Sequence, residues 1–363
     1  MDSPRSQFIT ALEYFWNGWA SARKDILLIV CGSATSWIVK KLLRNHGGLH
    51  NRLTDQINLK PFTLGECQQY AREANLGFTR RQIMETYMIL GGVPFYWSLL
   101  KSNLSMDQNI DALFFSEGPN NLRHEYEELY ASLFTNPEPY MKIIEALSQK
   151  GVGLTRDEIL KTTNLSSNGD FSRQLQELEW SGFIRRYQAL DKTVKESLYQ
   201  LIDNFTLFYH SFMAHAPRRS SNFWVSSANR HARDTWEGLA FERVCLLHVE
   251  QMKAKLGISG IMTEEYSCSL DSDPSKGISK VQIDLIINRA DDTINLCEMK
   301  FWNGELVITA AEQERIERRQ NSLAAATGYK KAILVTVVTP FGVKRNIHSG
   351  VAQCVITMDD LFG

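Results

Sequence analysis

Two short apolar segments near the C-terminus carry acidic and basic residues whose types and spacing suit phosphoryl chemistry. Asp284 lies within an aliphatic run, and Glu298 and Lys300 interrupt a second apolar run shortly after it. Residues two apart in a strand point to the same face, so Glu298 and Lys300 project together. The short polar turn between the runs brings Asp284 near them. Two carboxylates can share a hard divalent cation such as Mg²⁺, while a lysine orients the nucleophile or neutralises phosphate charge.

A simpler interpretation of these residues is a solvated strand face. Antiparallel strands often place charged residues on their wet side, and the sequence E-x-K alone is common. The context favours chemistry, because Asp284 sits among aliphatic residues and a further acid, Glu242, lies upstream in a predicted helix. The sequence leaves open whether the same geometry belongs to an active site or to a catalytically idle one.

A helix-borne acid, an Asp on a strand and an E-x-K on the next strand resemble the PD-(D/E)xK nuclease-like family. The resemblance implies that Asp284, Glu298 and Glu242 hold a metal ion, with Mg²⁺ as the expected cofactor. It also implies catalytic roles for Lys300, Glu298 and Asp284. The proline of the family signature is absent, since Ile283 precedes Asp284.

The segment that contains these residues reads as a mixed α/β sheet. The patterns predict a helix over 233–256, strands over 281–287 and 293–299, a long charged helix over 309–326 and an aliphatic strand over 332–338. In the PD-(D/E)xK family the helix after the core strands also contributes to the site. That resemblance implies a role for Gln313 or Arg315.

Upstream of this segment, residues 136–205 alternate short helices and strands. We expect helices over 140–149, from a cap at Thr155, and from 167 or 168 to 181, followed by strands over 183–189 and 197–202. Three helices and a two-stranded wing are the layout of a winged helix. Arg173, Arg185 and Arg186 are its candidate DNA-phosphate contacts. Such units also pack between domains without touching DNA, and three arginines make a small phosphate footprint.

The first part of the chain mixes helices with one aliphatic run. Apolar spacing predicts a helix over 7–20. Residues 26–31 (ILLIVC) are continuously apolar and end in Gly32, which predicts a central parallel strand buried on both faces. A helix over 36–43 follows, and Thr63 with Glu66 has the spacing of a capping box.

Residues 26–37 (ILLIVCGSATSW), 51–66 and 90–96 (LGGVPFY) resemble prokaryotic, archaeal-type AAA family ATPases in the same order. In that family a winged helix and a C-terminal nuclease-like domain follow, so the resemblance covers nearly the whole chain. It implies a partial AAA domain over 1–135, a winged helix over 136–205 and a nuclease-like domain over 206–363. Ser33 would be the sensor-1 residue, and Arg52 a nucleotide-sensing arginine unless it is only a solvated loop residue.

The chain departs from that family in lacking G-x-x-x-x-G-K-[ST], the loop that cradles nucleotide phosphates. The acidic Walker B strand is missing as well. We therefore expect an N-terminally truncated ATPase that does not hydrolyse ATP, with ATP and partner ATPase subunits belonging only to an intact form. The expected fold class is α/β multidomain: a partial P-loop ATPase sheet and lid, a winged helix and a restriction-endonuclease-like mixed α/β domain.

Bulk properties limit the remaining alternatives. A chain of 363 residues is long enough for two or three domains, and its net charge of −1 gives no overall attraction to nucleic acid. The six cysteines are scattered without metal-ligand spacing. No apolar run spans a bilayer, so we expect a cytoplasmic protein without a membrane partner. Metal-dependent action on DNA and an inert DNA-binding or protein-interaction scaffold both remain open.

Overall fold

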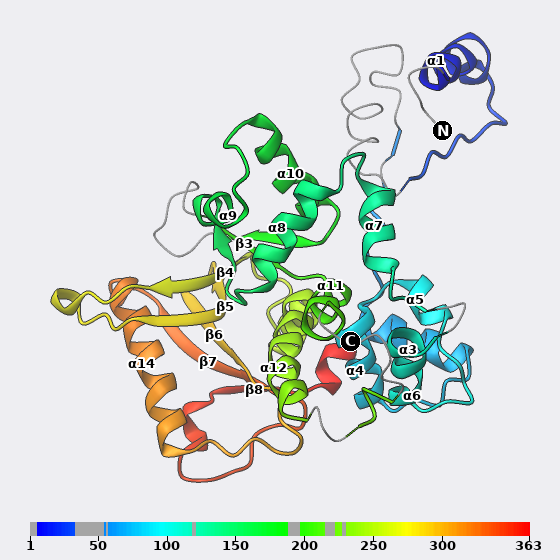
Figure 1. Cartoon of the computed structure of the whole chain (residues 1–363). Coiled ribbons are helices and arrows are strands. Elements are labelled where there is room, and N and C mark those ends of the chain that lie inside the picture. The colour runs from blue at the N-terminus through cyan, green and yellow to red at the C-terminus, as the bar shows by residue number, and fades with distance from the viewer. Residues whose placement is uncertain are drawn as a thin grey trace.

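The computed structural model describes residues 6–32, 54–55, 57–117, 121–187, 197–214, 222–226 and 230–363. These residues form a mixed α/β structure with helices around two sheets (Figure 1). The smaller sheet has the strand order β1-β3-β2, and the larger has the order β4-β5-β6-β7-β8. The expected α/β class is therefore confirmed.

The N-terminal segment confirms one expectation and corrects another. Helix α1 (Phe8–Gly18) forms where a helix was predicted, and 3₁₀ turn η1 (Ala20–Ala22) follows. Residues 26–31 were expected to be a buried central strand, but they form no strand, and Leu27 and Ile29 are 82% and 75% exposed. A strand needs neighbouring backbone to pair with, and no described strand precedes β1. The expected helix over 36–43 lies outside the described residues.

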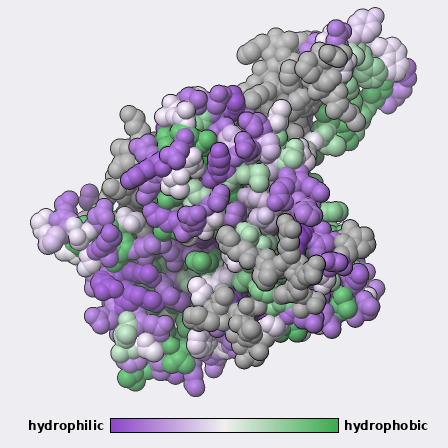
Figure 2. Space-filling view, viewed as in Figure 1, coloured by the Kyte–Doolittle hydropathy of each residue, from purple (hydrophilic) through white to green (hydrophobic). Residues whose placement is uncertain are grey.

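Figures 1 and 2 show this N-terminal segment projecting from the rest of the chain, with apolar side chains gathered on it. The expectation of a partial ATPase sheet is accordingly wrong for the described part of residues 6–135, which contains helices and no strand.

Residues 57–133 contribute a group of helices around the fully buried second half of α4. Thr63 and Thr79 begin α3 and α4 with capping boxes, and the first of these was predicted. The helices are α3 (Leu64–Glu73), α4 (Arg80–Leu90), α5 (Pro94–Ser98), α6 (Met106–Ile110), the π-helical turn η3 (Asp111–Phe115) and α7 (Glu125–Leu133).

The next unit contains three helices and the smaller sheet. Its elements are α8 (Glu138–Ser148), β1 (Leu154–Thr155), α9 (Arg156–Thr163), α10 (Gly169–Trp180), β2 (Ile184–Tyr187) and β3 (Leu198–Leu201). Thr155 and Asn168 cap α9 and α10 as expected. Strand β3 pairs antiparallel with both β1 and β2. The three predicted helices and two strands are confirmed, and β1 is an addition.

The larger sheet is antiparallel over β4-β5-β6 and parallel over β6-β7-β8. Its elements are β4 (Thr263–Leu270), β5 (Val281–Arg289), β6 (Thr293–Met299), α14 (Ala310–Ala326), β7 (Ala332–Val338) and β8 (Cys354–Ile356). Helix α14 runs along the left side of the sheet in Figure 1, and α12 lies on its other side. The predicted elements are confirmed, and β4 and β8 are additions.

The helix predicted over 233–256 is interrupted at His248. It consists of α12 (Arg230–Leu247) and α13 (Val249–Lys255), and His248 has non-helical dihedrals, φ −120° and ψ 30°. The buried ring of His248 bonds to Val244 O and accepts the Leu64 N–H at the start of α3. A contact with a helix far away in the sequence therefore accompanies the break.

One cluster of buried apolar side chains extends from Leu64 to Phe362. It joins the helices over 57–133, the unit with the smaller sheet, and part of the larger sheet. Between β3 and α12 it includes α11 (Asn204–Phe208) and the π-helical turn η5 (Tyr209–Met213). The last 3₁₀ turn, η9 (Asp359–Phe362), contacts both α3 and α13. The C-terminus thus lies at the centre of the molecule (Figure 1).

Candidate active site

The structure brings Asp284, Glu298 and Lys300 together, as the sequence predicted. Strands β5 and β6 are antiparallel neighbours, and Leu285 pairs with Cys297. Asp284 and Glu298 directly adjoin this pair in the sequence. The Lys300 Nζ is 3.2 Å from a carboxylate oxygen of Glu298. The antiparallel pairing of β5 and β6 thus brings together the segments that carry the three side chains.

A β-bulge in β5 modifies this simple geometry at Asp284. Two residues of β5, Asp284 and Leu285, lie opposite the single residue Ser267 of β4. A bulge bends its strand and turns the side chains away from the regular alternation. Ser267 Oγ donates a hydrogen bond to the backbone carbonyl of Asp284. Asp284 therefore occupies the one irregular position between β4 and β5.

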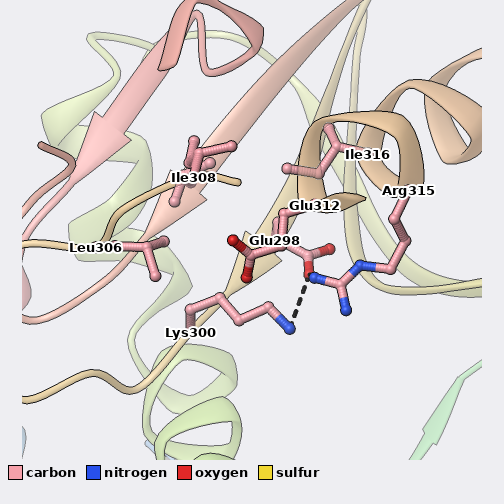
Figure 3. Close-up of a pocket in the computed structure, with 8 residues that line it drawn as sticks. Glu298, Lys300, Leu306, Ile308, Glu312, Arg315 and Ile316 are labelled. Atoms are coloured by element: carbon pink, nitrogen blue, oxygen red, sulfur yellow. Dashed lines mark hydrogen bonds and ion pairs between the residues drawn. The ribbon is translucent and has the colours of Figure 1, made fainter. Parts of the chain in front are cut away.

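Glu298 is 3% exposed and interacts with three cations. One is Lys300, which directly follows β6, and the others are Arg315, at 3.4 Å, and Arg319, both on α14. Figure 3 shows Lys300 and Arg315 approaching Glu298 from opposite sides. A buried carboxylate requires such compensation, because an unpaired buried charge is strongly destabilising. Glu298 is therefore fully neutralised by its surroundings.

Asp284, in contrast to Glu298, lies in surroundings that disfavour its negative charge. Its burial, followed by the nearby carboxylates of Glu242 and Glu298, raises the pKa of Asp284 from 3.8 to about 7. Arg319 and Lys300 act in the other direction but do not cancel this effect. Its carboxylate has one hydrogen bond from a side chain, from Gln282 at 3.3 Å. Surplus negative charge therefore surrounds Asp284, which a bound cation would relieve.

Glu242 reaches this region from α12. Its carboxylate accepts a hydrogen bond from Arg243, and Gln200 Nε2 lies 3.5 Å from the same oxygen. After burial, the charge of Glu242 is the next cause of the raised pKa of Asp284. The helical acid implied by the family resemblance thus acts electrostatically on the strand acid.

A divalent cation suits the chemistry of these donors but not their present pairing. Carboxylate oxygens are the ligands that Mg²⁺ prefers. Among the described residues, however, no three His, Cys, Asp or Glu side chains are arranged to hold a metal ion. The cations on Glu298 and Arg243 on Glu242 occupy the same oxygens. Metal binding at this site therefore requires some of these ion pairs to open.

The cavity beside Glu298 is small. It holds about 10 Å³ and is lined by Glu298, Lys300, Glu312 and Arg315 together with aliphatic side chains (Figure 3). That volume corresponds to about one water molecule. The side chains of Lys300 and Arg315 are 33% and 35% exposed, so solvent reaches their charged groups. A phosphate group would meet these two cations at the surface above Glu298.

The remaining predicted site residues that the structure describes lie outside this group. Ser33 and Arg52 are outside the described residues. Gln313 bonds to His348 at 2.8 Å and to Glu317 at 2.7 Å. Within its own helix, Arg173 pairs with Asp170 and reaches Glu177 at 3.8 Å. Neither Gln313 nor Arg173 joins the group around Glu298.

Arg185 and Arg186 are neighbours in β2 with different surroundings. Arg186 is exposed, whereas the Arg185 guanidinium donates to Gln200 at 2.6 Å and to Ser267 at 2.7 Å. Burial and the neighbouring Arg243 lower the pKa of Arg185 to about 10. Arg185 thus connects the two sheets, and its donors face protein acceptors rather than a DNA backbone.

Sequence reasoning missed Arg319, Arg243, Gln200 and Ser267. Arg319 lies four residues after Arg315, which puts both on one helix face, so the helical spacing was a usable signal. Arg243, Gln200 and Ser267 form hydrogen bonds with residues that are far away in the sequence. Nothing in their local sequence marks them.

Comparisons with protein-family models, with curated proteins and with solved structures gave no match for this chain. In the described residues, every helix is too short or too polar to cross a bilayer.

Proposed function

We propose that residues 206–363 form a PD-(D/E)xK nuclease-like domain that cleaves phosphodiester bonds in DNA with a divalent cation. One observation carries the proposal: strand pairing brings the segment of Asp284 on β5 next to Glu298 on β6, which Lys300 follows directly after the strand. The helical Glu242 acts electrostatically on Asp284. A mixed sheet with helices α12 and α14 alongside it supports the same fold assignment.

Each side chain has a role in this proposal. Asp284, Glu298 and Glu242 would hold Mg²⁺, which when bound activates water and stabilises developing charge on the phosphoryl group. Lys300 neutralises charge on the phosphate, because its ammonium group is partly exposed beside Glu298. Arg315 adds a second phosphate-facing cation from α14.

The other units fit supporting roles in the same proposal. Three helices and a three-stranded antiparallel sheet support a winged helix over 136–205. Its exposed cations Arg173 and Arg186 are the proposed DNA contacts. The helices over 57–133 would be the lid of an AAA-type ATPase, with ATPase subunits as partners. The sequence has no P-loop, so ATP is not proposed as a cofactor of this chain.

A catalytically inert DNA-binding or protein-interaction scaffold is the second candidate. The specific observation in its favour is the neutralisation of Glu298 by Lys300, Arg315 and Arg319. An ion cluster of this kind stabilises a fold without a metal. The two candidates therefore differ in whether these ion pairs open when Mg²⁺ and DNA are present.

Cleavage of supercoiled plasmid DNA in Mg²⁺ or Mn²⁺ tests the proposal. We expect wild type to nick the plasmid, Asp284→Ala and Lys300→Ala to lose at least about 100-fold in rate, and the exposed-lysine control Lys276→Ala to retain activity. No cleavage by wild type, together with salt-dependent DNA binding, would support the scaffold instead. Equal cleavage by all variants would indicate a contaminating nuclease.

A further inference from the structure

The bulge at Asp284 is connected by hydrogen bonds to the three-stranded sheet. Ser267, which lies opposite the bulge, donates to the Asp284 carbonyl and accepts from Arg185 Nη2 at 2.7 Å. Arg185 belongs to β2 of the smaller sheet. Two hydrogen bonds therefore join the irregular position of β5 to a strand about 100 residues earlier in the chain.

A second connection reaches Glu242 from the same sheet. Gln200 on β3 is 2% exposed, and its Nε2 donates to Gly151 O at 2.6 Å and approaches Glu242 at 3.5 Å. Its Oε1 accepts from Arg185 at 2.6 Å. The buried amide of Gln200 thus contacts two groups. One is Arg185, which bonds to Ser267 opposite the bulge, and the other is the carboxylate of Glu242 on α12.

Arg243 closes this network from the side of α12. It is 1% exposed, donates to Glu242, and also donates to Gly151 O at 2.5 Å and Leu201 O at 2.9 Å. Both carbonyls belong to the unit that contains the smaller sheet. Groups of that unit therefore hold Arg243, which in turn donates to Glu242.

We propose that the three-stranded sheet forms part of the carboxylate site, with Gln200 and Arg185 as positioning residues for Glu242 and Asp284. The catalytic meaning of this inference rests on the proposed nuclease function, whereas the coupling itself is a property of the fold. Groups that orient metal-ligating carboxylates influence metal affinity nearly as much as the ligands do. Removing the Gln200 amide leaves Arg185 with Ser267 as its remaining side-chain acceptor and leaves Glu242 without its second donor.

The full chain with Gln200→Met tests the coupling, because Met keeps the volume and removes the amide. The matched control is Gln176→Met, the same change at an exposed position of α10. We expect hydrogen exchange to accelerate about 10-fold or more in peptides covering 239–246 and 281–289 of Gln200→Met only. Unchanged exchange in both peptides overturns the inference. If Gln200→Met does not fold, Ser267→Ala cuts the connection to the bulge alone and takes its place.

Binding of Mn²⁺ alone, followed by electron paramagnetic resonance, tests the positioning role. We expect the affinity of Gln200→Met to fall about 10-fold or more, with that of Gln176→Met unchanged. For cleavage, kcat should fall while KM for DNA stays constant, since Gln200 is buried away from the substrate. Wild type that neither binds Mn²⁺ nor cleaves DNA refutes the proposed function, and the exchange result then still decides the coupling. Equal Mn²⁺ affinity in wild type and Gln200→Met overturns the positioning role.

Discussion

The guanidinium of Arg319 on α14 donates a hydrogen bond to the carboxylate of Glu298 on β6, near the middle of the candidate site. Arg319 also counteracts the raised pKa of Asp284. One arginine thus contacts one proposed metal ligand and acts electrostatically on another. It occupies the electrostatic position that a divalent cation would take.

Removing that arginine should favour metal binding. We expect Arg319→Gln to bind Mn²⁺ several-fold more tightly than wild type and to lose about 2 kcal/mol of unfolding free energy without metal, because a buried charge-assisted hydrogen bond is lost. Arg318→Gln, an exposed change on the same helix, is the control. Titration with Mn²⁺ and urea unfolding measure the two effects. Weaker binding by Arg319→Gln would show that Arg319 supports the metal site instead of competing for it.

His248 should make stability depend on pH. Burial lowers the pKa of His248 from 6.5, and its Nε2 accepts the Leu64 N–H at 2.9 Å, so folding favours the neutral ring. At a pH between the folded and unfolded pKa values of His248, the unfolded chain binds more protons than the folded one. The free energy of unfolding therefore falls as the pH drops below about 6.5. Above about pH 6.5, the contribution of His248 to the free energy of unfolding is fully present.

Urea unfolding between pH 5.5 and 8 measures this dependence. We expect His248→Gln to lose part of the slope below pH 6.5 and His348→Gln to retain it. An identical slope in wild type and His248→Gln would exclude His248 as the responsible group.

Replacing Arg185 should mainly reduce stability, whereas replacing Arg186 should mainly reduce DNA binding. We expect Arg185→Gln to lower the unfolding free energy by about 2–3 kcal/mol, since its bonds to Gln200 and Ser267 are largely buried. Arg186→Gln should change stability by less than about 0.5 kcal/mol and weaken salt-dependent DNA binding. Thermal unfolding and DNA titration separate the two. A purely DNA-binding defect in Arg185→Gln would contradict its structural position.

The C-terminal turn should be sensitive to a methyl group on α3. A Cβ at Gly65 would lie 2.4 Å from the carbonyl oxygen of Phe362, whereas a Cβ at Gly260 would meet nothing within 4 Å. We expect Gly65→Ala to cost about 1–3 kcal/mol and to speed carboxypeptidase digestion of the last residues, with Gly260→Ala as the neutral control. Equal digestion rates would show that η9 does not depend on this close approach.

The sequence by itself determined the local elements and the pairing that creates the site. Aliphatic runs predicted β5, β6 and β7, capping residues predicted the starts of α3, α9 and α10, and period-two alternation placed Glu298 and Lys300 together. These features depend on a few adjacent residues, so local patterns are sufficient to reveal them. The family resemblance and the function it implies stay predictions.

Only the tertiary structure decided how the site is surrounded. The bulge at Asp284 depends on the register with β4, a strand that the sequence patterns did not reveal. The burial of Arg185 and the break at His248 depend on contacts with Ser267 and Leu64, which lie 82 and 184 residues away. The aliphatic run over 26–31 has the local pattern of a strand but forms none, because β propensity alone is not sufficient without a partner strand. Long-range contacts of this kind leave no periodic mark in the sequence, since each depends on the packing of the whole chain.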